Sequence, residues 1–344
     1  MAGNATGSEL RQDRTTGRWL IIAPHRRLRP GAEPSIARSF ATRRRRRPPF
    51  DRDCPFCPGN EAALPGIIAE TRTKVPPNWA VRVIPNKFPA LTREATVEAG
   101  CSERHRALGG YGFHEVIIES PRHDADLASM TDGDIELVVR GYRDRSRYLL
   151  AHSRIEAVVL FRNHGPQGGA SLAHPHAQAV ALAFVPPTLG LVADWGRRYH
   201  HEHGRCPTCD EIAIERDLAI RIVDDTQHFV AFVPFASERP FETWLLPKQH
   251  QASFTDIDES LLVEFAHLLR RMLNRLHRAR DDPPYNFVID SAAGAETRSP
   301  CVHWRLRIAP TLAMPGGFEL GTGTAINPSS PEEDAAVLRA ASDG

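Results

Sequence analysis

The sequence has little lysine, few aromatic residues and no long apolar runs. Lysine occurs only at Lys74, Lys87 and Lys248, and aromatic residues make up 7% of the 344 residues. The 43 basic and 42 acidic residues nearly cancel, so the chain lacks the basic excess that binding to a nucleic-acid backbone exploits. No segment has the apolar length of a membrane helix, and the N-terminus lacks the apolar core of a secretion signal. These absences disfavour nucleic-acid and membrane partners and predict a cytoplasmic protein.

Cysteine is also scarce, with six residues in the chain. A disulfide framework is typical of small secreted domains, so in a long chain without a secretion signal the thiols are expected to be reduced. Four of the cysteines form two Cys-x-x-Cys pairs, whereas Cys101 and Cys301 stand alone. Metal binding is the leading interpretation of the pairs, although a redox pair or two buried thiols would produce the same spacing.

The two halves of the chain repeat one order of features. Each half has a Cys-x-x-Cys pair, an apolar segment closed by proline and histidine, a Thr-Asp pair before a helical pattern, a glycine-bearing loop and a histidine-bearing strand. His123 and His174 are 51 residues apart, and His250 and His303 are 53 apart. One supersecondary unit used twice accounts for this order. The sequence therefore predicts an α+β fold of two similar halves, each an antiparallel sheet with a packed helix.

The repeated cysteines and histidines predict a metal site in each half. Two thiolates one turn apart and two later imidazoles complete the tetrahedral Cys₂His₂ set that zinc favours. Because protein side chains fill all four positions, both sites are expected to be structural rather than catalytic. The first set is Cys54, Cys57, His123 and His174, and the second is Cys206, Cys209, His250 and His303.

The histidine-bearing strands of the two halves differ in one informative way. The first reads His174-Pro-His176-Ala-Gln178, whereas the second has histidine only at its first position, His303, and continues as Trp-Arg-Leu-Arg. His174 and His176 alternate along the strand and so project to one face. A histidine kept in only one copy is not expected to be architectural, although a satisfied core histidine is the alternative. We therefore predict that His176 is a nucleophile toward phosphorus.

The residues around His176 suit a phosphoryl-transfer site. The preceding loop, GPQGGAS, can cradle phosphate oxygens with backbone N–H groups, although glycine-rich loops are common. Gln178 follows on the same face and offers a neutral amide donor to the transferring group. A glutamine cannot shuttle a proton as a third histidine could, which favours transfer over hydrolysis.

HPHAQ, with CPFCPGNE upstream and GFELGTGTAINPSSPEEDAA downstream, resembles the galactose-1-phosphate uridylyltransferase family of the histidine-triad superfamily. The resemblance covers almost the whole chain and implies two histidine-triad-like domains. These are residues 1–190, with the nucleophile and the first zinc site, and residues 191–344, with the second zinc site. It also implies a homodimer with active sites near the subunit interface.

The resemblance implies a two-step exchange through a covalent nucleotidyl-histidine. His176 attacks the α-phosphorus of a nucleoside diphosphate sugar and releases a sugar 1-phosphate, and a second phosphate-bearing acceptor then takes the nucleotide. Gln178 stabilises the phosphoryl oxygens. The family's substrate-binding residues map onto Arg26, Arg29, Asn86, Asn163, Ser171 and Glu319.

The sequence departs from well-known bacterial members of that family. Arg307 and Ala309 occupy positions where those members carry iron-binding histidines, so no iron site is expected. The second Cys₂His₂ set instead resembles the second zinc site of a branch that includes ADP-glucose phosphorylase. Ala325 stands where uridylyltransferases carry a glutamine that helps bind the hexose.

Together these features predict a UDP-glucose:hexose-1-phosphate uridylyltransferase of galactose metabolism. The alternative is an adenylyltransferase like ADP-glucose phosphorylase, because the sequence does not separate uracil from adenine. A zinc-dependent nucleic-acid-binding protein is an alternative of a different class. It would use the basic run Arg43–Arg47, which the sequence pattern favours as a solvated loop.

Overall fold

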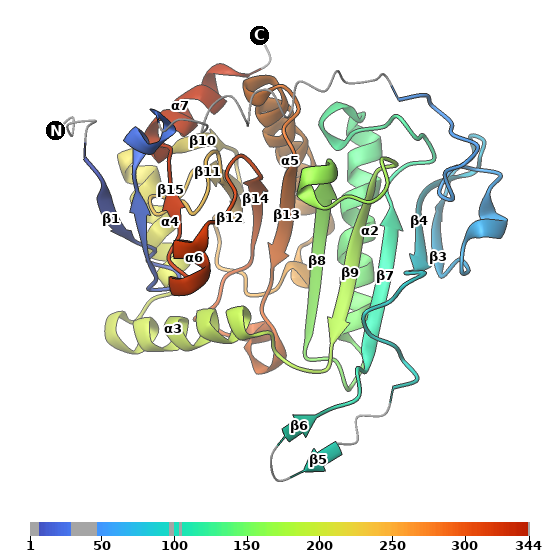
Figure 1. Cartoon of the computed structure of the whole chain (residues 1–344), viewed down its shortest axis with the longest axis horizontal. Coiled ribbons are helices and arrows are strands. Elements are labelled where there is room, and N and C mark those ends of the chain that lie inside the picture. Colours follow the sequence, from blue (N-terminus) through green and yellow to red (C-terminus); the bar gives the residue numbers. More distant parts are fainter. Residues whose placement is uncertain (1–6, 29–46, 96–99, 103–104, 343–344) are drawn as a thin grey trace.

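A computed structural model of the chain describes residues 7–28, 47–95, 100–102 and 105–342, and its centre is a ten-stranded antiparallel sheet (Figure 1). Each half of the chain supplies five strands. The first half gives β3 (Ala69–Arg72), β4 (Trp79–Pro85), β7 (Gly112–Ile118), β8 (Ala157–His164) and β9 (His176–Leu182). The second half gives β10 (Ile222–Asp225), β11 (Phe229–Phe232), β12 (Thr243–Pro247), β13 (Tyr285–Asp290) and β14 (Arg305–Pro310).

The order of the strands reflects the repeat in the sequence. It runs β10-β11-β12-β14-β13-β8-β9-β7-β4-β3, so the five strands of one half mirror the five of the other. The halves meet edge to edge where β8 pairs with β13, with Asn163 opposite Asn286 and Phe161 opposite Val288. The predicted α+β fold of two antiparallel sheets with packed helices is confirmed. The sequence did not predict that the two sheets would join into one.

The helix expected in each half lies on the same face of this sheet. These helices are α2 (Asp132–Leu150) and α5 (Glu259–Arg280), and both lie behind the sheet in Figure 1. α2 begins after Thr131, whose side chain accepts a hydrogen bond from the backbone N–H of Asp134, as an N-cap residue does. Together with the sheet they form the main core of the molecule.

Strand β9 shows how the sheet separates its core face from its polar face. Ala177, Ala179 and Ala181 are fully buried in the core that α2 covers. Because side chains alternate along a strand, His176 and Gln178 project from the opposite face. The small alanines bring the helix close to the strand and leave the other face free for polar groups.

The remaining elements surround the second half and the edges of the sheet. A three-stranded sheet pairs the N-terminal strands β1 (Glu9–Gln12) and β2 (Trp19–Ile22) with β15 (Ile326–Asn327), close to the C-terminus. The other elements are β5 (Gly100–Ser102), β6 (His105–Ala107), α3 (Pro187–His203), α4 (Pro207–Leu218), α6 (Gly317–Thr322), α7 (Pro331–Ala340) and short 3-10 helices η1 to η6 at Pro24–Leu28, Glu61–Ala63, Leu127–Ser129, Pro166–Gly168, Phe254–Asp256 and Gly294–Arg298.

The proposed boundary between residues 190 and 191 falls inside α3, while the strands of residues 9–22 lie with the second half of the chain. Among the described residues, no helix combines the length and the apolar character that crossing a bilayer requires.

The packing at the junction of the two halves predicts a large stability effect for Phe287 on β13. Its side chain is fully buried, and its ring lies 6.1 Å from that of Tyr142 on α2. Phe287→Ala should lower the free energy of unfolding by about 3–5 kcal/mol, because it leaves a cavity where the halves meet. Phe88→Ala is the matched control, since Phe88 is 84% exposed, and it should change the value by less than about 0.5 kcal/mol in denaturant unfolding. Equal effects of both changes would contradict this account of the core.

Candidate active site and metal centres

His176 is the first residue of β9, and its side chain is buried. Its Nδ1 donates a hydrogen bond to the backbone carbonyl oxygen of His174 at 2.8 Å. A carbonyl can only accept, so Nδ1 carries the proton and Nε2 keeps a free lone pair. Burial also lowers the pKa of His176, which favours the neutral ring. The imidazole is therefore held in the tautomer that a nucleophilic Nε2 requires.

A cavity of about 350 Å³ opens beside His176. Its lining includes Asn163 from β8 and Ser171 from the loop that precedes β9. The loop turns sharply because Gly165 and Gly169 have φ angles of +74° and +87°, values that L side chains rarely adopt. The structure therefore brings His176, Ser171 and Asn163 to one hollow with backbone of the glycine-rich loop around it.

Asn163 connects this loop to the second half of the chain. Its Oδ1 accepts a hydrogen bond from Nδ2 of Asn286 at 2.8 Å, and the same Nδ2 donates to the carbonyl oxygen of Gly168 at 2.6 Å. Asn163 Nδ2 in turn donates to the carbonyl oxygen of Gly169 at 3.3 Å. The loop is thus fixed by side chains on both strands of the central junction.

Gln178 lies two residues beyond His176 and contacts two polar side chains from neighbouring strands. Its Oε1 is 2.8 Å from Nε2 of His114 on β7 and 3.3 Å from Nδ2 of Asn86, which directly follows β4. All three side chains are partly buried. Asn86, one of the predicted substrate-binding residues, therefore contacts the candidate catalytic glutamine.

A buried charged network supports the other face of the sheet beneath the site. Arg162 Nε donates to Glu119 Oε2 at 3.0 Å, and Arg162 Nη1 donates to the hydroxyl of Tyr285 at 3.0 Å. The hydroxyl of Tyr142 also donates to Glu119. Burial alone would lower the pKa of Arg162. The Glu119 carboxylate and other neighbours raise this pKa instead, so the guanidinium stays charged. The network joins β7, β8, β13 and α2 around the start of β9.

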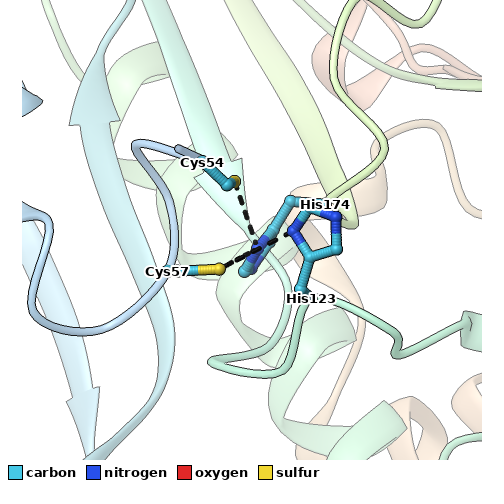
Figure 2. A group of neighbouring side chains, drawn as sticks. All are labelled: Cys54, Cys57, His123 and His174. Atoms are coloured by element: carbon cyan, nitrogen blue, oxygen red, sulfur yellow. Dashed lines mark hydrogen bonds between the residues drawn. The ribbon is translucent and has the colours of Figure 1, made fainter. Parts of the chain in front are cut away.

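The first predicted metal set comes together in the structure. Figure 2 shows the imidazoles of His123 and His174 turned toward the thiols of Cys54 and Cys57. His174 Nδ1 lies 3.7 Å from Cys54 Sγ and 3.6 Å from Cys57 Sγ, and His123 Nδ1 lies 3.6 Å from Cys57 Sγ. All four residues are buried, and burial lowers the pKa of His174 to about 4, which keeps its ring neutral for coordination.

The spacing of these atoms fits a zinc ion. Zinc bonds of about 2.3 Å to sulfur and 2.0–2.1 Å to nitrogen, at a tetrahedral angle, would separate sulfur from nitrogen by about 3.6 Å. His174 Nε2 donates to the carbonyl oxygen of Ser120 at 2.8 Å, so Nδ1 is left free to coordinate. Backbone contacts of this kind are typical of histidines that bind metal.

The second set comes together in the same way in the other half. Cys209 Sγ is 3.3 Å from His250 Nδ1 and 3.4 Å from His303 Nδ1, and His250 Nε2 donates to the carbonyl oxygen of Ser299 at 3.0 Å. Cys206, the fourth member, directly precedes α4 and lies within reach of the other three. Both groups are therefore possible metal-binding clusters.

The second half replaces the candidate catalytic residues by an ion-pair cluster. Arg305 and Arg307 occupy the positions on β14 that match His176 and Gln178, counted from His303. Both guanidinium groups donate to Asp290 on β13, and Arg305 also donates to the hydroxyl of Thr15 at 2.9 Å. Burial alone would raise the pKa of Asp290, but these two arginines lower it. Ion pairs with Asp290 therefore occupy the positions that His176 and Gln178 hold in the first half.

Two of the predicted substrate-binding residues lie away from the cavity beside His176. Glu319 on α6 lines a different cavity of about 280 Å³, together with Arg18 and Ala325. Arg26 is exposed on η1. Arg29 and residues 43–46 of the arginine run lie outside the described residues. Arg47, the last residue of that run, lines the cavity near His176 and donates to the carbonyl oxygen of Ala173.

Sequence reasoning missed three residues around the site. His114 interrupts an apolar strand, and that interruption was the only available signal. His164 lines the cavity, and its Nε2 contacts Asp282 Oδ1 at 2.9 Å. Nothing in the sequence indicated that pair, because Asp282 lies beyond the end of α5 in the other half.

The two metal sets predict the zinc content of the purified protein. The native chain should contain about two zinc ions, and Cys57→Ala or Cys209→Ala should each lower the content to about one, because each removes a ligand from one tetrahedral set. Cys301→Ala is the control, since Cys301 belongs to neither set. Metal analysis by mass spectrometry measures the ratio. A native content near one, or equal losses in the Cys301 variant, would contradict the assignment.

The sequence matches one family model and several characterised relatives. The model of the N-terminal domain of galactose-1-phosphate uridyl transferase matches residues 3–186. ADP-glucose phosphorylase of Arabidopsis thaliana is 37% identical over 96% of this chain and 92% of its own length. Galactose-1-phosphate uridylyltransferase of Thermotoga maritima is 27% identical over 96% of this chain and 98% of its own.

Solved structures show the same similarity. The crystal structure of the Arabidopsis thaliana ADP-glucose phosphorylase with bound ADP-glucose superposes with a TM-score of 0.82, at 35% identity, over 97% of this chain and 98% of that one. A uridylyltransferase structure gives a TM-score of 0.74 at 26% identity over 97% and 98% of the two chains. Both kinds of relative are nucleotidyltransferases, which confirms the predicted enzyme class. The chain belongs to the galactose-1-phosphate uridylyltransferase family.

Proposed function

We propose that this protein transfers a nucleoside monophosphate from a nucleoside diphosphate sugar to a phosphate-bearing acceptor through a covalent intermediate on His176. The observation that carries the proposal is the hydrogen bond from His176 Nδ1 to the His174 carbonyl, which leaves Nε2 as the unprotonated nitrogen beside the cavity. A glycine-rich loop and Ser171 line the same cavity and supply donors for phosphate oxygens.

In the first step, Nε2 of His176 forms a bond to the α-phosphorus of the donor. The bond between that phosphorus and the bridging oxygen breaks, and the sugar 1-phosphate leaves with the electron pair. Nδ1 keeps its proton throughout, and its hydrogen bond to the His174 carbonyl stabilises the charge that the ring acquires. In the second step, a phosphate oxygen of the acceptor attacks the same phosphorus and the bond to Nε2 breaks. Both leaving groups depart without a proton, so neither step needs a general acid.

The two Cys₂His₂ clusters take a structural role in this proposal. Four protein ligands would hold zinc in each set, namely Cys54, Cys57, His123 and His174 in the first and Cys206, Cys209, His250 and His303 in the second. Zinc in such a closed site stabilises the fold and leaves no position for substrate. The first set would fix His174, which lies two residues before His176, the first residue of β9.

The proposed activity is that of a UDP-glucose:hexose-1-phosphate uridylyltransferase in galactose metabolism, as the sequence predicted. A second candidate is adenylyl transfer from ADP-glucose with phosphate as the acceptor. Two observations favour this candidate: identity to the ADP-glucose phosphorylase is 37% against 27% for the Thermotoga maritima uridylyltransferase, and the second Cys₂His₂ cluster is intact. Both candidates use the same residues around His176.

Arg26, Arg29 and Glu319 belong to the proposal as substrate-binding residues, and we assign Arg26 and Glu319 to the active site of a second copy of the chain. Support comes from the positions of Arg26 and Glu319, which lie apart from the His176 cavity within one chain. A homodimer would bring such surfaces together at an active site. We also propose that the chain divides into domains 1–190 and 191–344 and that the protein is cytoplasmic.

A labelling experiment tests the chemistry directly. The protein is incubated with UDP-glucose or ADP-glucose carrying α-³²P, without acceptor, and acid-labile, base-stable label is measured on the chain. Native protein should be labelled, and His176→Ala should lose all label because the nucleophile is gone. His201→Ala is the control, since His201 is an exposed histidine on α3, and it should be labelled normally.

The two donors distinguish the two candidates. Label from UDP-glucose alone identifies a uridylyltransferase, and label from ADP-glucose alone identifies an adenylyltransferase. Label that survives His176→Ala, or no label from either donor, would refute the proposed intermediate.

A further inference from the structure

The side-chain amide of Gln178 is held by two donors that converge on its oxygen. His114 Nε2 lies 2.8 Å and Asn86 Nδ2 lies 3.3 Å from Gln178 Oε1. His114 and Asn86 come from β7 and from the end of β4, so two neighbouring strands supply the contacts. The direction in which the amide points decides whether Gln178 offers the phosphoryl group a donor or an acceptor.

A backbone N–H group fixes the proton on His114. The N–H of Ala90 donates to Nδ1 of His114 at 3.1 Å. A backbone N–H cannot accept a hydrogen bond, so Nδ1 is unprotonated and the neutral ring carries its proton on Nε2. Nε2–H therefore donates to Gln178 Oε1.

A second backbone N–H group fixes the orientation of Asn86. The N–H of Phe88 donates to Asn86 Oδ1 at 2.8 Å, which places the NH₂ group of Asn86 on the side of Gln178. Asn86 Nδ2 lies 3.1 Å from His114 Nε2, so both nitrogens lie beside the same atom of Gln178. The N–H of His114 Nε2 and the NH₂ group of Asn86 both face Gln178. The Gln178 atom that they contact must therefore accept hydrogen bonds, so it is the oxygen.

We propose that His114 is a positioning residue that fixes the Gln178 amide with its NH₂ group directed toward the phosphoryl group attacked by His176. This inference rests on the proposed function of His176. The oxygen of Gln178 is engaged by the two donors, and the amide nitrogen is the atom left to reach the substrate. A phosphoryl group gathers negative charge on its oxygens, so it is stabilised by N–H and repelled by a carbonyl oxygen.

Loss of the donor on His114 would allow the side-chain amide of Gln178 to flip, so that its oxygen and its NH₂ group exchange places. Gln178 would then present its oxygen to the phosphoryl group in part of the molecules. Removal of a single donor of this kind typically slows the chemical step by about 10²–10³-fold, so partial loss of orientation should slow it by about 10–100-fold. Donor affinity should change by less than about 3-fold, because the contact strengthens mainly in the transition state.

The experiment measures the single-turnover rate of His176 labelling at saturating nucleotide sugar, using whichever donor labels the native protein. His114→Phe keeps an aromatic ring but removes both nitrogens, and it should be about 10–100-fold slower. His114→Gln retains one group that can accept from Ala90 and one that can donate to Gln178, so it should recover most of the rate. A double variant of His114→Phe with Gln178→Ala should be no slower than Gln178→Ala alone.

Asn86→Asp provides an isosteric second test that does not change the volume of the site. Its carboxylate still accepts a hydrogen bond from the N–H of Phe88 but presents an oxygen to Gln178. The Gln178 amide then flips to direct its NH₂ group toward that oxygen. It should slow labelling by about 10–100-fold at saturating nucleotide sugar. Melting temperatures of all variants show whether each one is folded.

The outcomes separate this inference from the function on which it rests. Absence of label in the native protein would refute the function itself. Normal labelling of the native protein with an unchanged rate in folded His114→Phe, or in Asn86→Asp, would refute the positioning role alone. A folded His114→Gln as slow as His114→Phe would also refute it, as would a further loss in the double variant.

Discussion

The site depends on the antiparallel pairing of β8 with β13, which joins the two halves of the chain. This pairing places Asn286 of the second half opposite Asn163 of the first, so that one amide can reach both the Asn163 side chain and the Gly168 carbonyl. It also stacks Tyr285 against His164, with ring centres 4.6 Å apart. The glycine-rich loop, which is shaped internally by the short 3-10 helix η4, is therefore also held by a strand from the other repeat. The second half thus supports this loop, whereas His176 belongs to the first half.

The difference between the repeats follows from what arginine and histidine can do in a buried strand. A guanidinium group keeps its charge, so Arg305 and Arg307 need a carboxylate, and Asp290 on the paired strand supplies it. A neutral imidazole with one nitrogen bonded to a carbonyl is already satisfied, and its second nitrogen can remain free. His176 can therefore stay buried and chemically available, whereas the equivalent arginine cannot. The two repeats therefore satisfy the same strand positions in different ways, one with a neutral imidazole and the other with ion pairs.

Much of the fold and part of the site could be predicted from the sequence because they rest on local patterns or on the repeat. The strand pattern and the alternation of His174, His176 and Gln178 predicted β9 and the face shared by His176 and Gln178, and the repeated spacing identified the members of both Cys₂His₂ clusters. The contacts of Gln178 could not be predicted, because they join strands far apart in sequence. They also depend on backbone N–H groups of Phe88 and Ala90, whose direction no residue type reveals.

The substrate-binding residues taken from the family resemblance show a different limit. Sequence similarity assigns Arg26 and Glu319 to functional positions of the family but does not say which side chains lie near them in this chain. Glu319 lines a cavity with Arg18 and Ala325, separate from that of His176. A residue can therefore match a family position in sequence while the structure places it away from the other matched residues.

His174 connects the first Cys₂His₂ cluster to His176 through three separate atoms. Its Nδ1 faces the two thiols, its Nε2 donates to the Ser120 carbonyl, and its own carbonyl oxygen accepts a hydrogen bond from His176 Nδ1. Each contact restricts a different part of the residue, so the ring and the peptide group are both fixed. The hydrogen bond to that carbonyl holds the proton on His176 Nδ1, and the two other contacts of His174 restrict the residue that carries the carbonyl. The geometry of the buried Cys₂His₂ cluster therefore bears on which nitrogen of His176 is unprotonated, two residues away along the chain.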